Sequence, residues 1–158
     1  MSAARIKTRV RSKVSGVAES HSLTLLTARD LVDVSDEPVE RGGTNEGFAP
    51  TEFFLASLAA CTNVISHKIA KKNSIEISAL EVRVDAEFDR LGVTLQEEVA
   101  LPFPQIFLEI RIRAELSKAQ FDTLRSDLPR FCPVSKMIEQ AGTRIVTDWI
   151  VERPAQPV

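Results

Sequence analysis

The sequence predicts an α+β fold, in which an antiparallel sheet packs with a long central helix, and three observations lead to this prediction. The segment from residue 50 to residue 72 has the composition of one long buried helix. The segments 80–88 and 106–114 alternate apolar and charged residues, which is typical of half-buried antiparallel strands. The elements also follow the order strands, long helix, two strands, two helices and strand, which differs from the repeated βα units of a doubly wound fold.

Length and composition limit the classes to which the protein can belong. The chain has 158 residues, which suits one domain over 1–158 with a loose tail at 153–158. Apolar residues make up 44% and charged residues 27%, as in ordinary soluble proteins. The net charge is −2 without a basic block, so nucleic acid is not an expected partner. The longest apolar run has about nine residues, too short to cross a bilayer, so no membrane partner is expected.

The first residues of the chain bear on its location. The segment MSAARIKTRVRSK is basic, but it lacks the apolar stretch and the cleavage site of a secretory signal. We therefore expect a cytoplasmic protein, whose thiols are reduced at rest.

Short strands and a loop are predicted before the long helix. Residues 6–14 and 20–28 each have the pattern of a strand, with Ser15 and Gly16 near the turn between them, and residues 31–34 suggest a third strand. Residues 36–49 are rich in glycine, asparagine and acidic side chains, which predicts a loop.

The long helix has recognisable ends and an unusual surface. Pro50 fits the first helical position, where its missing N–H costs nothing. Glu52 in the first turn and Lys71 and Lys72 in the last turn match the helix dipole. The first half is apolar nearly all round and rich in small residues, which predicts burial on every side against a neighbouring helix.

The C-terminal half supplies two more helices and a last strand. The connection 91–105 is too apolar for a plain solvent loop, so we expect it to cover a pocket or a partner subunit. Ser117 is placed to cap a helix that runs to about Arg130. The pair Cys132-Pro133 opens a shorter helix that ends near Gly142, and residues 144–152 form the final strand.

The two cysteines are the candidate chemical groups, since a thiol attacks peroxides and can be regenerated. Cys132 stands before a helix start, where exposed N–H groups favour the thiolate and lower the thiol pKa. Cys61 lies in the middle of an apolar helix, which raises a thiol pKa and favours a packing role. By this argument Cys132 is the more reactive thiol, although both cysteines can also be structural. A transient disulfide between them is allowed, whereas a permanent one does not suit a reducing compartment.

Two other kinds of chemistry lack support in the sequence. His21 and His67 are the only histidines, and neither has a metal-ligand spacing to a cysteine, so we expect no metal. The G-x-S-x-G element of serine hydrolases is absent.

Two motifs together resemble the OsmC/Ohr superfamily, the osmotically induced and organic hydroperoxide resistance proteins. They are APTEFFLASLAAC with the following TNVIS, which contains Cys61, and CPVSKM, which begins at Cys132. The resemblance implies an OsmC-like fold, an intertwined homodimer and a thiol peroxidase that needs no cofactor. It implies that Cys61 attacks the hydroperoxide and becomes a sulfenic acid, and that Cys132 resolves it to a disulfide. This order is the reverse of the one that the helix-dipole argument favours.

The resemblance also implies an arginine that stabilises the thiolate, twenty residues before the attacking cysteine, which is Arg41 here. A glutamate that directly follows the helix-opening proline accompanies this arginine in the family's peroxidases. This chain has Thr51 at that place and a carboxylate one residue later, at Glu52. A shift of one residue turns a helical side chain by about 100°. The alternative function is therefore a dimer that binds an apolar small molecule or senses oxidants, with little or no turnover.

The expected substrate pocket is apolar, which favours organic hydroperoxides over hydrogen peroxide. Its candidate lining residues are Phe53, Phe54, Phe131 and Phe103. By the resemblance, the reductant is a small dithiol or a lipoyl-type group.

Overall fold

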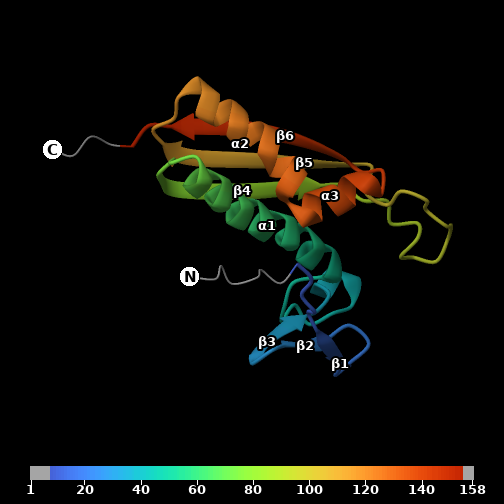
Figure 1. Ribbon diagram of the computed structural model, residues 1–158. Helices are drawn as coiled ribbons and strands as arrows, with labels where there is room; N and C mark the ends of the chain where they lie inside the picture. The colour runs from blue at the N-terminus through green and yellow to red at the C-terminus, as the bar shows by residue number, and fades with distance from the viewer. Residues whose placement is uncertain (1–7, 155–158) are drawn as a thin grey trace. The chain divides into compact units, whose positions relative to one another are not determined.

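The computed structural model describes residues 8–154, which divide into two compact units at Phe53–Phe54 (Figure 1). The single domain expected over 1–158 stays a prediction. Residues 155–158 of the expected tail lie outside the described residues.

The N-terminal unit contains a three-stranded antiparallel sheet. Its strands are β1 (Ser15–Ala18), β2 (Thr24–Ala28) and β3 (Leu31–Ser35), in the order β1-β2-β3. The loop that follows contains a short 3-10 helix, η1 (Val39–Arg41). The expected third strand at 31–34 is thus confirmed and is one residue longer.

The strand expected at 6–14 is wrong for its described part, because residues 8–14 form no strand. Ser15 and Gly16 lie inside β1, and the turn to β2 comes after them. The hydroxyl of Ser20 forms this turn by accepting hydrogen bonds from the backbone N–H groups of Ser22 and Leu23. The alternation of apolar and polar residues does not show which segments pair in a sheet. It also does not reveal a turn that is fixed by a serine side chain.

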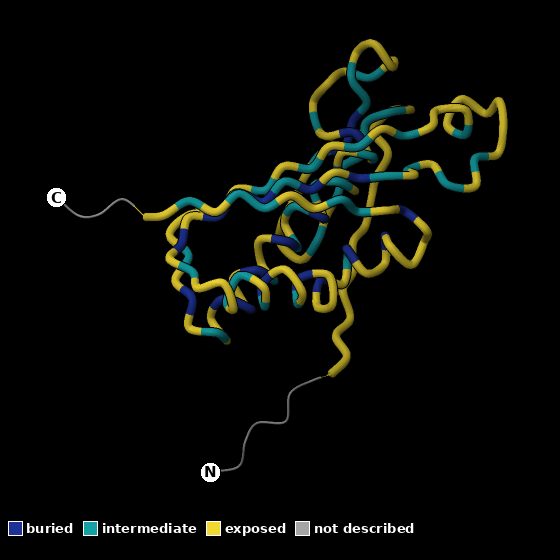
Figure 2. The backbone as a smooth tube through the Cα atoms, turned by 90° about the horizontal axis from the view of Figure 1, so that it is seen from above, coloured by how far each residue is buried: buried dark blue, intermediate teal, exposed yellow. Residues whose placement is uncertain are grey.

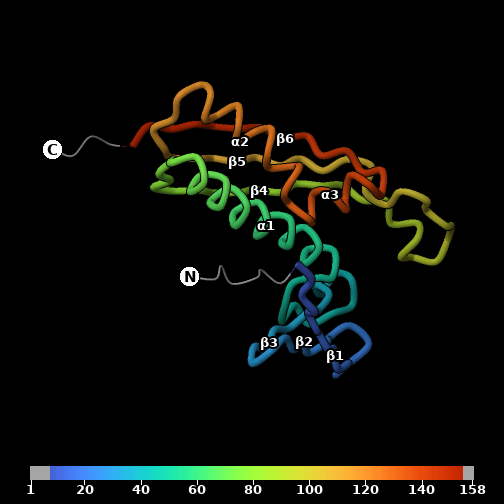
Figure 3. Tube along the Cα trace, in the orientation of Figure 1, coloured from blue at the N-terminus to red at the C-terminus, as the bar shows by residue number. Residues whose placement is uncertain are grey.

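The C-terminal unit is built on a second three-stranded sheet, of β4 (Ile77–Ala86), β5 (Gln105–Ala114) and β6 (Arg144–Glu152). β4 and β5 are antiparallel, as expected, but β6 runs parallel to β5, so the sheet is mixed. The helices α2 (Lys118–Phe131) and α3 (Pro133–Gln140) cause this difference. They form a crossover between β5 and β6, which returns the chain to the same end of the sheet (Figure 3).

The core of this unit lies between one face of the sheet and the helices (Figure 1). α1 (Pro50–Lys72) has the predicted bounds, and its part beyond Phe53 packs on the same face as α2 and α3. Along β5 the inward residues are buried while the alternate residues remain more exposed. Figure 2 shows the degree of burial along the whole backbone. The largest fully buried apolar side chains are Leu58, Ile106, Ile110, Ile112 and Leu124.

The chain itself covers one side of α1. In the first half of the helix Leu58 is buried and Phe54 is 37% exposed, and in the second half Thr62, Ser66, Ile69 and Ala70 are buried while Val64 is 48% exposed. Burial of the remaining surface against a neighbouring helix stays a prediction. Among the described residues, α1 is the one helix whose length and composition fit a membrane span. Because its inner side chains belong to the hydrophobic core, α1 is a core helix.

The connection between β4 and β5 extends past the end of the sheet (Figure 1). Its tip is exposed, with Leu95 at 93% and Val93 at 65% exposure, so the chain itself does not cover these apolar residues. At its base Phe88 stacks on Phe103, with ring centroids 5.3 Å apart. The role expected for this segment, to cover a pocket or a partner, stays a prediction.

Candidate active site

The structure brings the two cysteines together although 71 positions separate them in the sequence. The Sγ atoms of Cys61 and Cys132 are 2.8 Å apart, and both residues are free thiols. Cys61 comes from the middle of α1, and Cys132 from the junction of α2 and α3. A disulfide needs sulfurs at about 2.05 Å, so little movement separates this arrangement from a bond.

Local backbone structure fixes the position of Cys132. Its backbone N–H donates to Leu128 O at 2.9 Å at the end of α2, and it is also the N-cap of α3. Its Sγ accepts a hydrogen bond from the N–H of Ser135 at 3.4 Å. Pro133 at the first position of α3 suits this start, as the sequence predicts. Cys132 is fully buried, so solvent does not reach it.

Burial reverses the expected electrostatics of Cys132. Burial, together with the hydrogen bond to Cys61, raises the pKa of the Cys132 thiol to about 11. The N–H groups of Ser135 and Val134 act in the opposite direction but do not compensate. The expectation that the helix start makes Cys132 the low-pKa thiol is therefore wrong, because the loss of solvation outweighs the helix terminus.

Cys61 is the less buried of the two cysteines. It is half-buried and packs against the edge of the core beside Leu58 and Ile65 on the same side of α1. The thiol of Cys132 donates its hydrogen to Cys61 Sγ, so the two residues have different roles in the contact. A reagent from solvent therefore meets Cys61 first, while Cys132 stays protonated behind it.

Aromatic side chains gather on the same side of α1. Phe54 lies seven residues before Cys61, which is about two helical turns along the same face. Its ring centroid is 5.2 Å from that of Phe103, which also stacks on Phe88. Sequence reasoning identified Phe54 and Phe103 but missed Phe88, whose only signal is its place at the end of the alternating strand pattern. Phe131 is 53% exposed, and the guanidinium of Arg130 lies over its ring.

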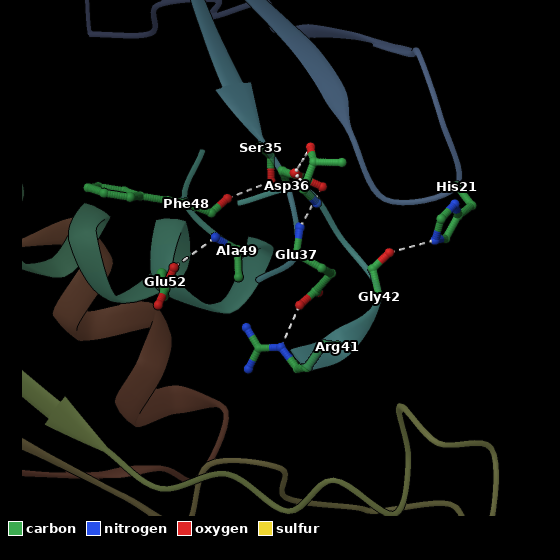
Figure 4. A network of polar contacts seen from close by, with 10 residues as sticks. His21, Ser35, Asp36, Glu37, Arg41, Gly42, Phe48, Ala49 and Glu52 are labelled. Atoms are coloured by element: carbon green, nitrogen blue, oxygen red, sulfur yellow. Dashed lines mark hydrogen bonds and ion pairs between the residues drawn. The ribbon is translucent and has the colours of Figure 1, made fainter. Parts of the chain in front are cut away.

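Glu52 and Phe53 both stabilise the start of α1 within the N-terminal unit, and Figure 4 shows Glu52 beside Ala49. Glu52 Oε2 accepts a hydrogen bond from the N–H of Ala49 at 2.8 Å, and Phe53 packs on Phe48 with ring centroids 5.6 Å apart. A glutamate that returns to the N-cap backbone and an apolar pair across the cap are common stabilisers of a helix start. The catalytic role expected for Glu52 and the substrate contact expected for Phe53 stay predictions.

Arg41 ends η1 in the N-terminal unit, whereas Cys61 belongs to the C-terminal unit. Its Nε donates to Glu37 Oε2 at 2.6 Å (Figure 4). The role of Arg41 toward Cys61 stays a prediction, while its partner Glu37 was missed at the sequence level. Four residues separate the two, which is a common spacing for ion pairs on a helix, but the sequence indicates a loop here.

A buried carboxylate, also missed, organises the loop that carries Arg41. Asp36 is 0% exposed and accepts hydrogen bonds from the N–H groups of Glu37, Thr44 and Glu46 and from the Thr44 hydroxyl. The Thr44 hydroxyl, with further support from Ser22 and the backbone, holds the pKa of Asp36 well below its ordinary value although burial opposes this. Asp36 is therefore a fixed anion at neutral pH.

Comparison with known proteins gives a consistent family. The sequence pattern of the OsmC-like protein family matches residues 43–148. Among solved structures, an OsmC-like protein from Mycoplasma pneumoniae superposes with a TM-score of 0.73 at 16% identity, over 92% of this chain and 99% of that one. No curated protein matches the sequence.

Two structures of organic hydroperoxide resistance proteins are also similar. The protein from Legionella pneumophila gives a TM-score of 0.65 at 17% identity, over 92% of this chain and 99% of its own. The protein from Bacillus subtilis gives a TM-score of 0.56 at 22% identity, over 92% of this chain and 98% of its own. At these identities the likeness establishes the fold.

Proposed function

The chain belongs to the OsmC-like protein family, and we propose that it is a thiol-dependent peroxidase that reduces organic hydroperoxides. The observation that carries this proposal is the contact between an accessible and a buried thiol, 2.8 Å apart, on one side of the core helix. Two thiols at this distance can pass from sulfenic acid to disulfide without rearrangement of the fold.

The proposed cycle begins at Cys61. Its thiolate attacks the terminal oxygen of the hydroperoxide, the O–O bond breaks, and the alkoxide leaves with a proton as an alcohol. Cys61 is then a sulfenic acid. The sulfur of Cys132 attacks Cys61 Sγ, a disulfide forms, and the sulfenic oxygen leaves as water. An external dithiol, or a reduced lipoyl-type group, returns both cysteines to thiols and is itself oxidised to a disulfide.

The different environments of the cysteines support this division of roles. Cys61 is half-buried, so a peroxide can reach its sulfur, while Cys132 is fully buried. A raised pKa keeps Cys132 protonated near neutrality, which suits a second thiol that waits for the sulfenic acid. In the first step, Arg41 stabilises the thiolate and the developing negative charge on the leaving oxygen.

The substrate contacts are apolar. The ring pair of Phe54 and Phe103 lies on the side of α1 that also carries Cys61, and these rings suit the alkyl or aryl group of an organic hydroperoxide. Phe131 and Phe53 complete the proposed lining. The carboxylate of Glu52 accepts from the N–H of Ala49 at the helix start, and its catalytic role remains part of the proposal.

The proposed form is a cytoplasmic homodimer. The outward side of α1 leaves Val64 48% exposed, and the N-terminal sheet leaves Val17 and Val32 59% and 68% exposed. The apolar, small-residue surface of α1 is the part of the chain that a partner would cover. A second copy of the chain supplies this cover.

A second candidate function is the binding of an apolar small molecule or the sensing of oxidants by the same dimer. Thr51, which stands where the family's peroxidases have a glutamate, favours this alternative.

Consumption of cumene hydroperoxide in the presence of dithiothreitol tests the proposal. We expect repeated turnover by the wild-type protein and none by Cys61→Ser, since a serine hydroxyl forms no sulfenic acid. Oxidation of the thiols without turnover would favour the oxidant sensor. Thiols that do not react with the hydroperoxide would favour the small-molecule binding protein. Arg41→Ala should slow the first step, with an unchanged circular dichroism spectrum as the control for folding.

A further inference from the structure

Two neighbouring carboxylates at the end of β3 point to different partners in the loop that carries Arg41 (Figure 4). We propose that Asp36 and Glu37 are positioning residues for Arg41: Asp36 fixes the loop backbone, and Glu37 fixes the direction of the guanidinium. This inference rests on the proposed action of Arg41 on Cys61.

The first part of the argument is the way in which Asp36 closes the loop. Its Oδ1 accepts from the N–H of Glu37 at 2.8 Å, and its Oδ2 accepts from the N–H of Thr44 at 2.8 Å and of Glu46 at 3.2 Å. The Thr44 hydroxyl adds a fourth bond at 2.7 Å. A single buried carboxylate thus holds the chain on both sides of Arg41. Asp36→Asn replaces one carboxylate oxygen by an NH2 group, which cannot accept from these partly buried N–H groups.

The backbone around this carboxylate leaves little freedom. Gly42, directly after Arg41, has a φ of +90°. Its carbonyl oxygen lies 3.0 Å from His21 Nε2. A Cβ on Gly43 would collide with the backbone carbonyl of Glu37. The N–H of Gly43 donates to Pro38 O at 3.1 Å, and the N–H of Asn45 donates to Glu37 O at 3.2 Å. The segment therefore has one well-defined path, which places Arg41 at a fixed point.

The second part is the geometry of the Glu37–Arg41 pair. Glu37 Oε2 accepts a hydrogen bond from the Nε–H of Arg41 at 2.6 Å, at the edge of the guanidinium. The side chain of Glu37 is 33% exposed and that of Arg41 is 28% exposed. A guanidinium has five N–H groups, of which four are on the two terminal nitrogens. Within residues 8–154 these nitrogens have no hydrogen-bond partner, and in Figure 4 they point away from Glu37. Glu37 thus orients Arg41 while the four terminal N–H groups stay available for a thiolate or peroxide oxygen.

An ion pair with Glu37 can also weaken Arg41 instead of positioning it. The two roles predict changes of opposite sign in the reaction rate when the Glu37 charge is removed. If Glu37 only neutralised Arg41 or held it back, removal of the Glu37 charge would strengthen the effect of Arg41 on Cys61 and speed the reaction. If Glu37 positions Arg41, removal lets the side chain rotate freely and slows the reaction. The sign of the change therefore decides between the two.

The variants are Glu37→Gln and Asp36→Asn, each in a Cys132→Ser background so that Cys61 is the only thiol. The rate of Cys61 alkylation as a function of pH and the rate of cumene hydroperoxide reduction in a single turnover are measured. For Glu37→Gln we expect both rates near neutrality to fall about two- to fivefold, with the alkylation profile moved to higher pH. For Asp36→Asn we expect a fall of about tenfold. Glu37→Asp, which keeps the charge, should restore part of the loss.

The matched control is Asp122→Asn, which removes a 2.6 Å ion pair with Lys118 at the same four-residue spacing in α2. It should leave both rates unchanged. If Asp36→Asn fails to fold, as judged by circular dichroism, Glu37→Gln still tests the proposal. A faster or unchanged rate in Glu37→Gln, with a reactive wild type, overturns the inference and leaves the proposed function intact.

An unreactive wild type instead overturns the proposed function. The positioning is then tested by the NMR signal of the Arg41 Nε–H, which should exchange slowly with water in the wild type and at least about twofold faster in Glu37→Gln. Equal exchange in both proteins overturns the positioning as well.

Discussion

Closure of the Cys61–Cys132 disulfide should accelerate about a hundredfold between pH 7 and pH 9, because Cys132 must lose its proton to attack. Burial is the main cause that raises the pKa of Cys132, to about 11. Cys132 is 0% exposed in the reduced protein, and we expect this burial to persist when Cys61 is oxidised. The experiment therefore varies only the pH. It measures the attack of Cys132 on the sulfenic acid of Cys61, which follows the reaction with the peroxide.

The pKa sets the size of the effect. Near a pKa of about 11 the ionised fraction at pH 7 is about one in ten thousand, against about one in a hundred for the ordinary value of 9.0. The rate of thiolate attack thus loses about a hundredfold from burial. A more basic thiolate is also a better nucleophile, which returns about tenfold, so the net slowing is about tenfold. Contact with Cys61 at 2.8 Å compensates, because the attack is intramolecular.

Rapid quenching measures this step directly. One equivalent of cumene hydroperoxide oxidises Cys61, the reaction is stopped at increasing times by an alkylating reagent, and mass spectrometry counts sulfenic acid and disulfide. Cys132→Ser, with a small thiol added to resolve Cys61, is the control. Its pH profile should level off near the pKa of the added thiol. In the wild type the rate should rise about tenfold per pH unit up to about pH 10.

A closure rate that stays flat from pH 7 to pH 10 would refute the reasoning. It would mean either that Cys132 is already ionised, as the helix-start argument expects, or that it reacts without prior loss of its proton.

Three further predictions concern stability and assembly. Leu124→Ala should lower the free energy of unfolding in urea by about 2–5 kcal/mol, since Leu124 is 0% exposed, whereas Leu95→Ala, at a 93% exposed position, should not change it. Glu52→Ala should cost about 0.5–1 kcal/mol in the same assay, because the N–H of Ala49 loses its acceptor; an unchanged unfolding curve would argue against the cap. Sedimentation should find a dimer at micromolar concentration, and a stable monomer there would contradict the proposed assembly.

Much of the fold follows from sequence patterns. The bounds of α1 and of β6 agree with the prediction, because Pro50 and the lysine pair mark the helix and a run rich in β-branched residues marks the strand. The mixed sheet was not predictable from these patterns, since alternation gives no strand direction. The N-terminal strands were less accurate, because a serine-centred turn at Ser20 carries a weak signal.

The candidate site required three-dimensional information. Local sequence identified both cysteines, but it placed the low pKa on Cys132 because a helix start is visible in sequence and full burial is not. The family resemblance gave the opposite order for the two cysteines, and their burial and hydrogen bond support that order. Asp36 and Glu37 are ordinary loop acids in the sequence, and only the closed loop reveals their partners.

The most direct test of the central claim is the location of the first oxygen. Cys61→Ser and Cys132→Ser proteins are treated with a single equivalent of cumene hydroperoxide and analysed by mass spectrometry. We expect Cys132→Ser to consume the equivalent and retain one oxygen on Cys61, where it stays open to further oxidation, and Cys61→Ser to remain reduced. Oxygen on Cys132 in the Cys61→Ser protein, with Cys61 untouched in the Cys132→Ser protein, would contradict the assignment.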